Sequence, residues 1–229
     1  LFMQLDELLR TRRSCRLYRR KPIDFDTLGQ ILQAGLWAPS SGNLQNWEFV
    51  VVTDAGKREQ LAKACVDQEW MVTAPVHLVV CNDRERVKKM YPRRWELYSI
   101  QNCALAAGNI LMKASDLGLG SCWIGSFDET AVKRILRIPS HIEPELIITL
   151  GYPALVDDVG EREPLSVVTH FEVYGAKHRE GAVSSFPLGP QLGKRMDNLR
   201  DRVVDASEQI KKKSWFSRLF EKKKEKENV

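Results

Sequence analysis

The apolar and polar positions of the first 175 residues switch several times between a helical period and a strand period. Helical spacing, bounded by Asp, Gly or Pro, predicts helices over residues 5–12, 24–38, 56–65, 97–117 and 128–138. Short runs rich in Val and Ile predict strands over residues 47–54, 74–82, 145–153 and 165–174. Because the elements lack a regular βαβ alternation, the pattern indicates an α+β fold with one central sheet flanked by helices.

Composition then divides the chain into three parts. Gly, Pro and Ser become frequent after Gly175, so we expect a folded domain over residues 1–175, a linker over 176–193 and a tail over 194–229. The net charge is +5, and residues 191–229 account for it with twelve Lys and Arg against seven Asp and Glu. The remainder is balanced, which argues against nucleic-acid binding by the folded domain.

The sequence lacks the motifs of several classes of enzyme. The stretch "GLGSCWIG" has Trp123 where a dinucleotide fingerprint needs its third glycine, and it follows a predicted helix instead of a strand. Walker A, HExxH and GxSxG sequences are absent, and the four histidines lack metal-ligand spacing. We therefore expect neither a metal site nor a hydrolase.

The five cysteines and the lack of long apolar runs bear on the location of the protein. No two of the cysteines have CxxC spacing, and most lie in apolar surroundings, so we expect reduced, buried thiols. No apolar run approaches the length of a membrane span, and the first residues lack a signal-peptide pattern. Together these features predict a cytoplasmic protein.

Two polar motifs remain as candidate binding sites. "RTRRSCRLY" places Arg12, Arg13, Ser14 and Arg16 together at a helix end. This is either a solvated basic face or an anion clamp, because guanidinium groups bind phosphate through paired hydrogen bonds. "APSSGNLQNWEF", residues 38–49, holds far more hydrogen-bonding side chains than a connection between a helix and a strand requires.

Together with "GLGSCWIGSFD" and "GYPA…EREPL", these motifs resemble the nitroreductase family of FMN-dependent oxidoreductases, in the same order and with similar spacing from about Leu5 to Gly175. The resemblance implies an α+β fold with a mostly antiparallel sheet, a homodimer, and FMN reduced by NADH or NADPH. It implies no catalytic side chain, because the flavin itself carries the chemistry.

The resemblance also implies roles for particular residues. Arg12, Ser14 and Arg16 would hold the phosphate and ribityl chain, with Arg16 near the N1/O2 edge of the ring. The partner subunit would line the flavin edge with its Pro39, Ser40, Ser41 and Asn43. A backbone N–H of the stretch containing Trp123, Gly125 and Ser126 would reach N5.

The chain departs from the family pattern at a basic pair that grips the phosphate. Arg162 matches the second basic position, but Gly160 stands at the first, and Arg13 is a candidate replacement. The segment near Gln68 offers no match for a further ring-contacting residue.

The predicted function is transfer of two electrons from NAD(P)H through FMN to a small acceptor such as a nitroaromatic or a quinone. Two alternatives share every motif: a specialised flavin enzyme, such as a dehalogenase or flavin-fragmenting enzyme, and a non-enzymatic flavin-binding sensor. The basic and aromatic segment 82–98 is either a substrate lid, with Tyr91, Arg93, Arg94 and Trp95 contacting substrate, or a solvated connection.

The tail has no counterpart in the resemblance and carries a prediction of its own. Its last part, "KKKSWFSRLFEKKKEK", is either a solvated end or a weak anchor on anionic membranes. On the second interpretation, the full chain should co-sediment with anionic vesicles in a salt-sensitive way, whereas a chain ending near Gly193 should not. Equal partitioning of the two chains would identify the tail as a solvated end.

Overall fold

The computed structural model describes residues 4–155 and 159–177. The chain divides into two units, residues 1–159 and 160–229, which are described separately. Of the linker and tail predicted for 176–229, all but Ala176 and Lys177 lie outside the described residues. The predicted boundary at residue 175 therefore stays a prediction.

The first unit is built on a four-stranded antiparallel sheet. Its strands are β1 (Trp47–Val52), β2 (Val76–Asp83), β3 (Gly120–Ile124) and β4 (Ile142–Gly151), in the order β1-β2-β4-β3. β2 and β4 lie at the centre and carry continuous apolar runs, while β1 and β3 form the edges. The α+β fold with an antiparallel central sheet, expected from the sequence, is confirmed.

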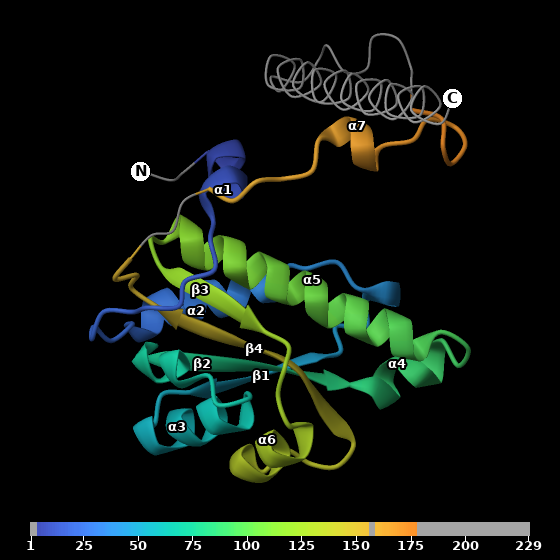
Figure 1. Ribbon diagram of the computed structural model, residues 1–229. Helices are drawn as coiled ribbons and strands as arrows, with labels where there is room; N and C mark the ends of the chain where they lie inside the picture. The colour runs from blue at the N-terminus through green and yellow to red at the C-terminus, as the bar shows by residue number, and fades with distance from the viewer. Residues whose placement is uncertain (1–3, 156–158, 178–229) are drawn as a thin grey trace, which may run out of the picture. The chain divides into compact units, whose positions relative to one another are not determined.

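Helices cover both faces of this sheet. α2 (Phe25–Leu36) and α5 (Trp95–Asp116) pack on one face, and α3 (Ala55–Ala64) and α6 (Glu129–Leu136) lie on the other (Figure 1). The alternation of side chains along β4 explains why one strand serves both cores. Leu146, Ile148 and Leu150 pack toward α5, whereas Ile147 belongs to the core beneath α3 and α6.

Aspartate caps set the starts of four helices. Asp24, Asp54, Asp83 and Asp128 each accept a hydrogen bond from the backbone N–H three residues later, which begins α2, α3, α4 (Arg84–Met90) and α6. At the other end of α5, Gly118 follows the last turn with a φ of +73°, a conformation that glycine adopts without strain. α1 (Leu5–Thr11) precedes these helices.

Two strand predictions need correction, and one strand was missed. The strand predicted over 165–174 is wrong: this stretch holds the short helix α7 (Leu165–Val168) and no strand. Pro164 begins a turn there, closed by the Val167 N–H on its carbonyl, and Val167 and Val168 stay exposed. The strand predicted over 47–54 is confirmed as β1, whose apolar run indicates a buried strand, but β1 is an edge strand with Glu48 and Val51 exposed. β3 was not predicted, because its Gly, Ser and Cys residues give no strand pattern.

Two expectations about the whole chain can be compared with the described part. All five cysteines are free and buried, as predicted. Within residues 4–155 and 159–177, no helix has the length and apolar character needed to cross a bilayer.

A buried histidine predicts how stability depends on pH. His77 in β2 is inaccessible to solvent and its Nε2 lies 2.8 Å from the Met71 carbonyl, and burial lowers its pKa to about 4. Because the unfolded chain has the higher pKa, about 6.5, the stability present above that value is lost as pH falls toward 4. The free energy of unfolding should fall by about 2 kcal/mol between pH 7.5 and pH 5 through this group.

Urea unfolding at the two pH values measures this loss. His77→Leu removes the titrating group while keeping an apolar side chain in the core, so its unfolding free energy should depend less on pH than that of the parent. Equal pH dependence in both proteins would show that His77 is not the group responsible.

Candidate functional site

The N-terminal basic motif runs along the outer edge of β3. Ser14 forms a parallel bridge with Ser121, and the Cys15 N–H donates to the Ser121 carbonyl at 2.9 Å. The structure therefore brings together two of the stretches on which the predicted flavin site depends, "RTRRSCRLY" and "GLGSCWIGSFD". They lie far apart in the sequence, and the sheet edge unites them.

Three of the predicted flavin ligands, Arg12, Ser14 and Arg16, are near enough to Cys122 to influence its thiol. Burial raises the pKa of the Cys122 thiol, while the charge of Arg16, a hydrogen bond with the Ser14 side chain and the charge of Arg12 oppose that rise. Within residues 4–155 and 159–177, neither Arg12 nor Arg16 forms an ion pair. Two guanidinium groups without a carboxylate, beside a hydroxyl, are a donor set suited to a phosphate.

The neighbouring Arg13 lies close to Ser14, and both residues line the same small hollow. This hollow has a volume of about 160 Å³ and is also lined by Ser115 and Gly118, at the carboxyl end of α5. Arg13 Nη1 donates to the Arg12 carbonyl. Gly160 stands where the family pattern has a basic residue. That Arg13 contacts the flavin phosphate in its place stays a prediction.

The predicted N5 contact lies on the exposed continuation of the same strand. In an antiparallel edge strand, every second residue directs its N–H and C=O away from the sheet. Ser121 does so, since its carbonyl accepts from Cys15, and Trp123 two residues later must do the same. Trp123, Gly125 and Ser126 are all exposed. A backbone donor is thus available to a ligand at this edge.

Many polar groups of the loop 38–46 form hydrogen bonds within the protein. Ser40 Oγ accepts from the Gln45 N–H at 3.1 Å, and Asn43 Oδ1 accepts from Gln45 Nε2 at 3.0 Å. Ser41 donates from both N and Oγ to Asn102 Oδ1, at 2.9 and 3.2 Å. Gly42, Asn43 and Gln45 have positive φ angles, so these bonds hold a turn that an unsupported chain would rarely adopt. The polar side chains therefore stabilise the conformation of the loop.

The loop and the basic motif lie at different ends of α5. Pro39, Ser40 and Ser41 share a hollow of about 480 Å³ with Asn102 and Leu105, whereas Arg13 and Ser14 lie near Ser115. At 1.5 Å per residue, the helix from Asn102 to Ser115 is about 20 Å long. Within one chain the structure does not bring these two motifs together.

The segment 82–98 runs from the end of β2 through α4 and a turn into the start of α5. α4 fills its first part, and Arg86 Nη1 donates to the Gln45 carbonyl at 2.9 Å. Tyr91 packs edge-on against Tyr98, with ring centroids 5.2 Å apart, and its hydroxyl lies against Gly42. Arg93 and Arg94 are exposed. This segment braces the loop 38–46, and its action as a substrate lid stays a prediction.

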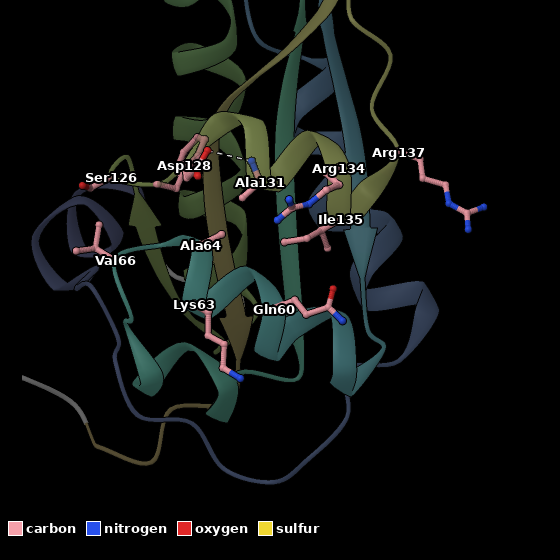
Figure 2. Close-up of a pocket in the computed structure, with 11 residues that line it drawn as sticks. Gln60, Lys63, Ala64, Val66, Ser126, Asp128, Ala131, Arg134, Ile135 and Arg137 are labelled. Atoms are coloured by element: carbon pink, nitrogen blue, oxygen red, sulfur yellow. Dashed lines mark hydrogen bonds between the residues drawn. The ribbon is translucent and has the colours of Figure 1, made fainter.

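A further hollow lies elsewhere, between α3 and α6. It has a volume of about 1020 Å³, and Figure 2 shows Gln60 and Lys63 on one side with Arg134 and Ile135 on the other. Of the residues predicted to bind flavin, Ser126 alone lines it. This hollow is therefore not the predicted flavin site. Arg162 belongs to the second unit, where its Nη1 donates to the Glu161 carbonyl, and its phosphate contact stays a prediction.

Sequence reasoning missed a buried polar cluster behind the loop. Asn46, Asn82 and Asn102 are at most 2% exposed, and each lies in or beside an element that the sequence predicts to be core. A buried amide needs hydrogen-bond partners. Three asparagines within apolar segments were therefore the sequence feature that could have indicated this cluster. The pattern could not show that they bond to one another.

The chain resembles proteins of one family throughout this unit. The model of the nitroreductase family matches residues 9–70 and 60–152. A putative NADH dehydrogenase/NAD(P)H nitroreductase of Archaeoglobus fulgidus is 34% identical over 151 residues, 64% of this chain and 84% of that protein. An NADH dehydrogenase of Thermus thermophilus is 33% identical over 185 residues, 69% of this chain and 90% of that protein.

A solved structure extends the resemblance to the fold. The NADPH:FMN oxidoreductase from Vibrio harveyi complexed with NAD+ superposes with a TM-score of 0.68 and 31% sequence identity. The match covers 74% of this chain and 77% of that one. Its fold, the sheet with helices on both faces and the family match all agree: the chain belongs to the nitroreductase family.

Proposed function

We propose that this protein is an FMN-dependent oxidoreductase that passes two electrons from NADH or NADPH to a small acceptor such as a nitroaromatic or a quinone. The observation that carries the proposal is the convergence of Arg12, Ser14 and Arg16 at the edge of β3. The similarity to the Vibrio harveyi NADPH:FMN oxidoreductase supports the same cofactor and the same class of reductant.

The residues at the strand edge fit FMN by their chemistry. Arg12 and Ser14 would hold the phosphate, and the planar guanidinium of Arg12 offers two parallel donors to its oxygens. Arg16 adds a second positive charge, which favours the negatively charged reduced form of a ring bound beside it. When bound, FMN supplies the hydride chemistry itself.

The exposed edge beyond Trp123 would admit the substrates. Gly125 has no side chain to cover a ring bound against this strand, and the Trp123 backbone directs its polar groups outward. A flat nicotinamide or acceptor could then approach the flavin in turn. This arrangement is consistent with alternating use of one face by reductant and acceptor.

The site would be completed by a second copy of the chain. The loop 38–46 lies about 20 Å along α5 from the motif of Arg12, Ser14 and Arg16. At that distance the two motifs of one chain would not contact the same edge of one flavin ring. Next to the loop, Leu36 is 53% exposed and Trp37 79% exposed, and α5 exposes Leu97, Ile100 and Leu105. Apolar surface of this kind is typical of a subunit interface. A homodimer would bury it and bring the partner's loop to the flavin.

Membrane contact through the tail is a separate proposal. It would place the reductase beside membrane-borne acceptors such as quinones, and it rests on the charge and aromatic pattern of residues 211–226. The vesicle experiment described above tests it.

The test of the proposed function combines cofactor identity with turnover. Flavin released from the purified protein by heat should be FMN and not FAD, and the protein should oxidise NADH or NADPH when a quinone or nitroaromatic is added. Removing FMN should abolish the turnover and adding it back should restore it. Turnover that is unaffected by FMN removal would contradict the proposal.

A further inference from the structure

A continuous chain of hydrogen bonds, buried in its middle and part-buried at its ends, runs from the loop 38–46 to the central sheet. Ser41 donates to Asn102 Oδ1 from N and Oγ, and Asn102 Nδ2 donates to Asn46 Oδ1 at 2.7 Å. Asn46 Nδ2 donates to Asn82 Oδ1 at 2.7 Å, and Asn82 Nδ2 donates to Glu145 Oε1 at 2.7 Å. We refer to Asn102, Asn46 and Asn82 as the amide chain.

The two ends of the amide chain determine the orientation of every amide. At one end the backbone N–H of Ser41 can only donate, so the Asn102 atom that faces it must be oxygen. At the other end the Glu145 carboxylate can only accept while it is ionised, and Arg84 donates to the same Oε1 from Nε and Nη2 at 3.2 and 2.9 Å. Each donor therefore points toward Glu145, and reversing any single amide would oppose two like atoms.

The energetics favour a single arrangement. Asn46, Asn82 and Asn102 are 0 to 2% exposed, so water cannot replace a bond that is lost. A buried polar group left without a partner is costly, and hydrogen bonds in series strengthen one another. Asn46 Nδ2 also contacts the Ser99 carbonyl at 3.2 Å, which ties the chain to α5 a second time.

We propose that the amide chain is a positioning device for the flavin: Asn102 and Asn46 hold Ser41 and its loop in the one conformation that meets FMN bound by the partner subunit. This inference rests on the proposed function. The loop contains three positive φ angles and needs such a support, and the amide chain connects it to β2 and β4, the most buried strands. Asn102 and Asn46 are positioning residues, since they act through Ser41.

The first experiment measures FMN affinity on apoprotein. Asn102→Leu keeps the size of the side chain and removes its acceptor and donor, and we expect FMN binding to weaken about tenfold or more. Ile147→Ala is the matched control, because Ile147 is equally buried but lies on the opposite face of the sheet. Thermal unfolding of both apoproteins compares their loss of stability. The control should bind FMN within about twofold of the parent at a similar or larger loss of stability.

The second experiment distinguishes positioning from general destabilisation and applies even if the leucine variant does not fold. In Asn102→Asp, the carboxyl group when protonated can donate to Asn46 and accept from Ser41, as the native amide does. When ionised it cannot donate, and burial favours the protonated form. FMN affinity relative to the parent should therefore recover as pH is lowered from about 8 to about 5.

Three outcomes decide the matter. Weak binding by Asn102→Leu beyond its control, or recovery of Asn102→Asp at low pH, supports the positioning role. FMN affinity equal to the parent in both variants at every pH would overturn it and leave the proposed function intact. A parent apoprotein that does not bind FMN would overturn the proposed function and this inference with it.

Discussion

Arg12→Ala should weaken FMN binding ten- to a hundredfold. Arg12 is half-buried beside Ser14 and Arg16 at the edge of β3, and it has no ion-pair partner in the described part of the chain. A hydrogen bond between charged groups contributes about 1.5–3 kcal/mol, and a bound phosphate would lose such bonds with the guanidinium. Fluorescence titration of the apoprotein with FMN measures the change.

Two further variants make this result specific. Arg10→Ala removes the same charge from the exposed end of α1, two residues earlier, and should leave FMN affinity within about twofold of the parent. Arg12→Lys retains the charge but not the planar pair of donors, so its affinity should fall between those of the parent and Arg12→Ala. If Arg12→Ala binds FMN as well as Arg10→Ala does, the phosphate clamp is assigned to the wrong residues.

A mixed dimer of two defective chains should regain one working site of two. One chain carries Arg16→Ala, and the other carries Ser40→Ala with Asn43→Ala. If the clamp and the loop of one site come from different chains, each homodimer has two damaged sites. In the mixed dimer, both lesions fall on the same site and the other site is intact. Its FMN content and turnover should then approach half those of the parent.

Separation of differently tagged chains allows this measurement on the mixed species alone. Its thermal unfolding should match that of the parent, which shows that both variants fold. A folded mixed dimer with no more FMN or turnover than the two homodimers would mean that both motifs act within one chain, despite their separation along α5.

The periodic parts of this fold could be predicted from sequence, and the irregular parts could not. β2 and β4 carry long apolar runs, and Asp24 and Asp128 mark helix starts, so local patterns were sufficient there. β3 escaped prediction because five residues containing Gly, Ser and Cys have no period, and it is stabilised by pairing with β4. The 165–174 stretch has β-forming residues but no partner strand, so a prediction from propensity alone gave a strand that does not form.

The candidate site shows the same division. The motif of Arg12, Ser14 and Arg16 was visible as a cluster of charge, and the sheet edge that assembles it with Cys122 needed the fold. The loop 38–46 was conspicuous for its polar residues, yet the structure shows Ser40 and Ser41 bonded within the protein. The amide chain that supports them depends on contacts between residues 36 to 63 positions apart, which no local pattern encodes.

The most direct test of the account is reduction of the bound flavin by a nicotinamide cofactor. The holoprotein is mixed with NADH and, separately, with NADPH in the absence of oxygen, and the visible absorbance of the flavin is followed. The account predicts rapid bleaching by at least one of the two, and return of the colour when a quinone is added. Flavin that keeps its colour with both cofactors, but bleaches with a chemical reductant, would contradict the oxidoreductase and favour a flavin-binding protein without this activity.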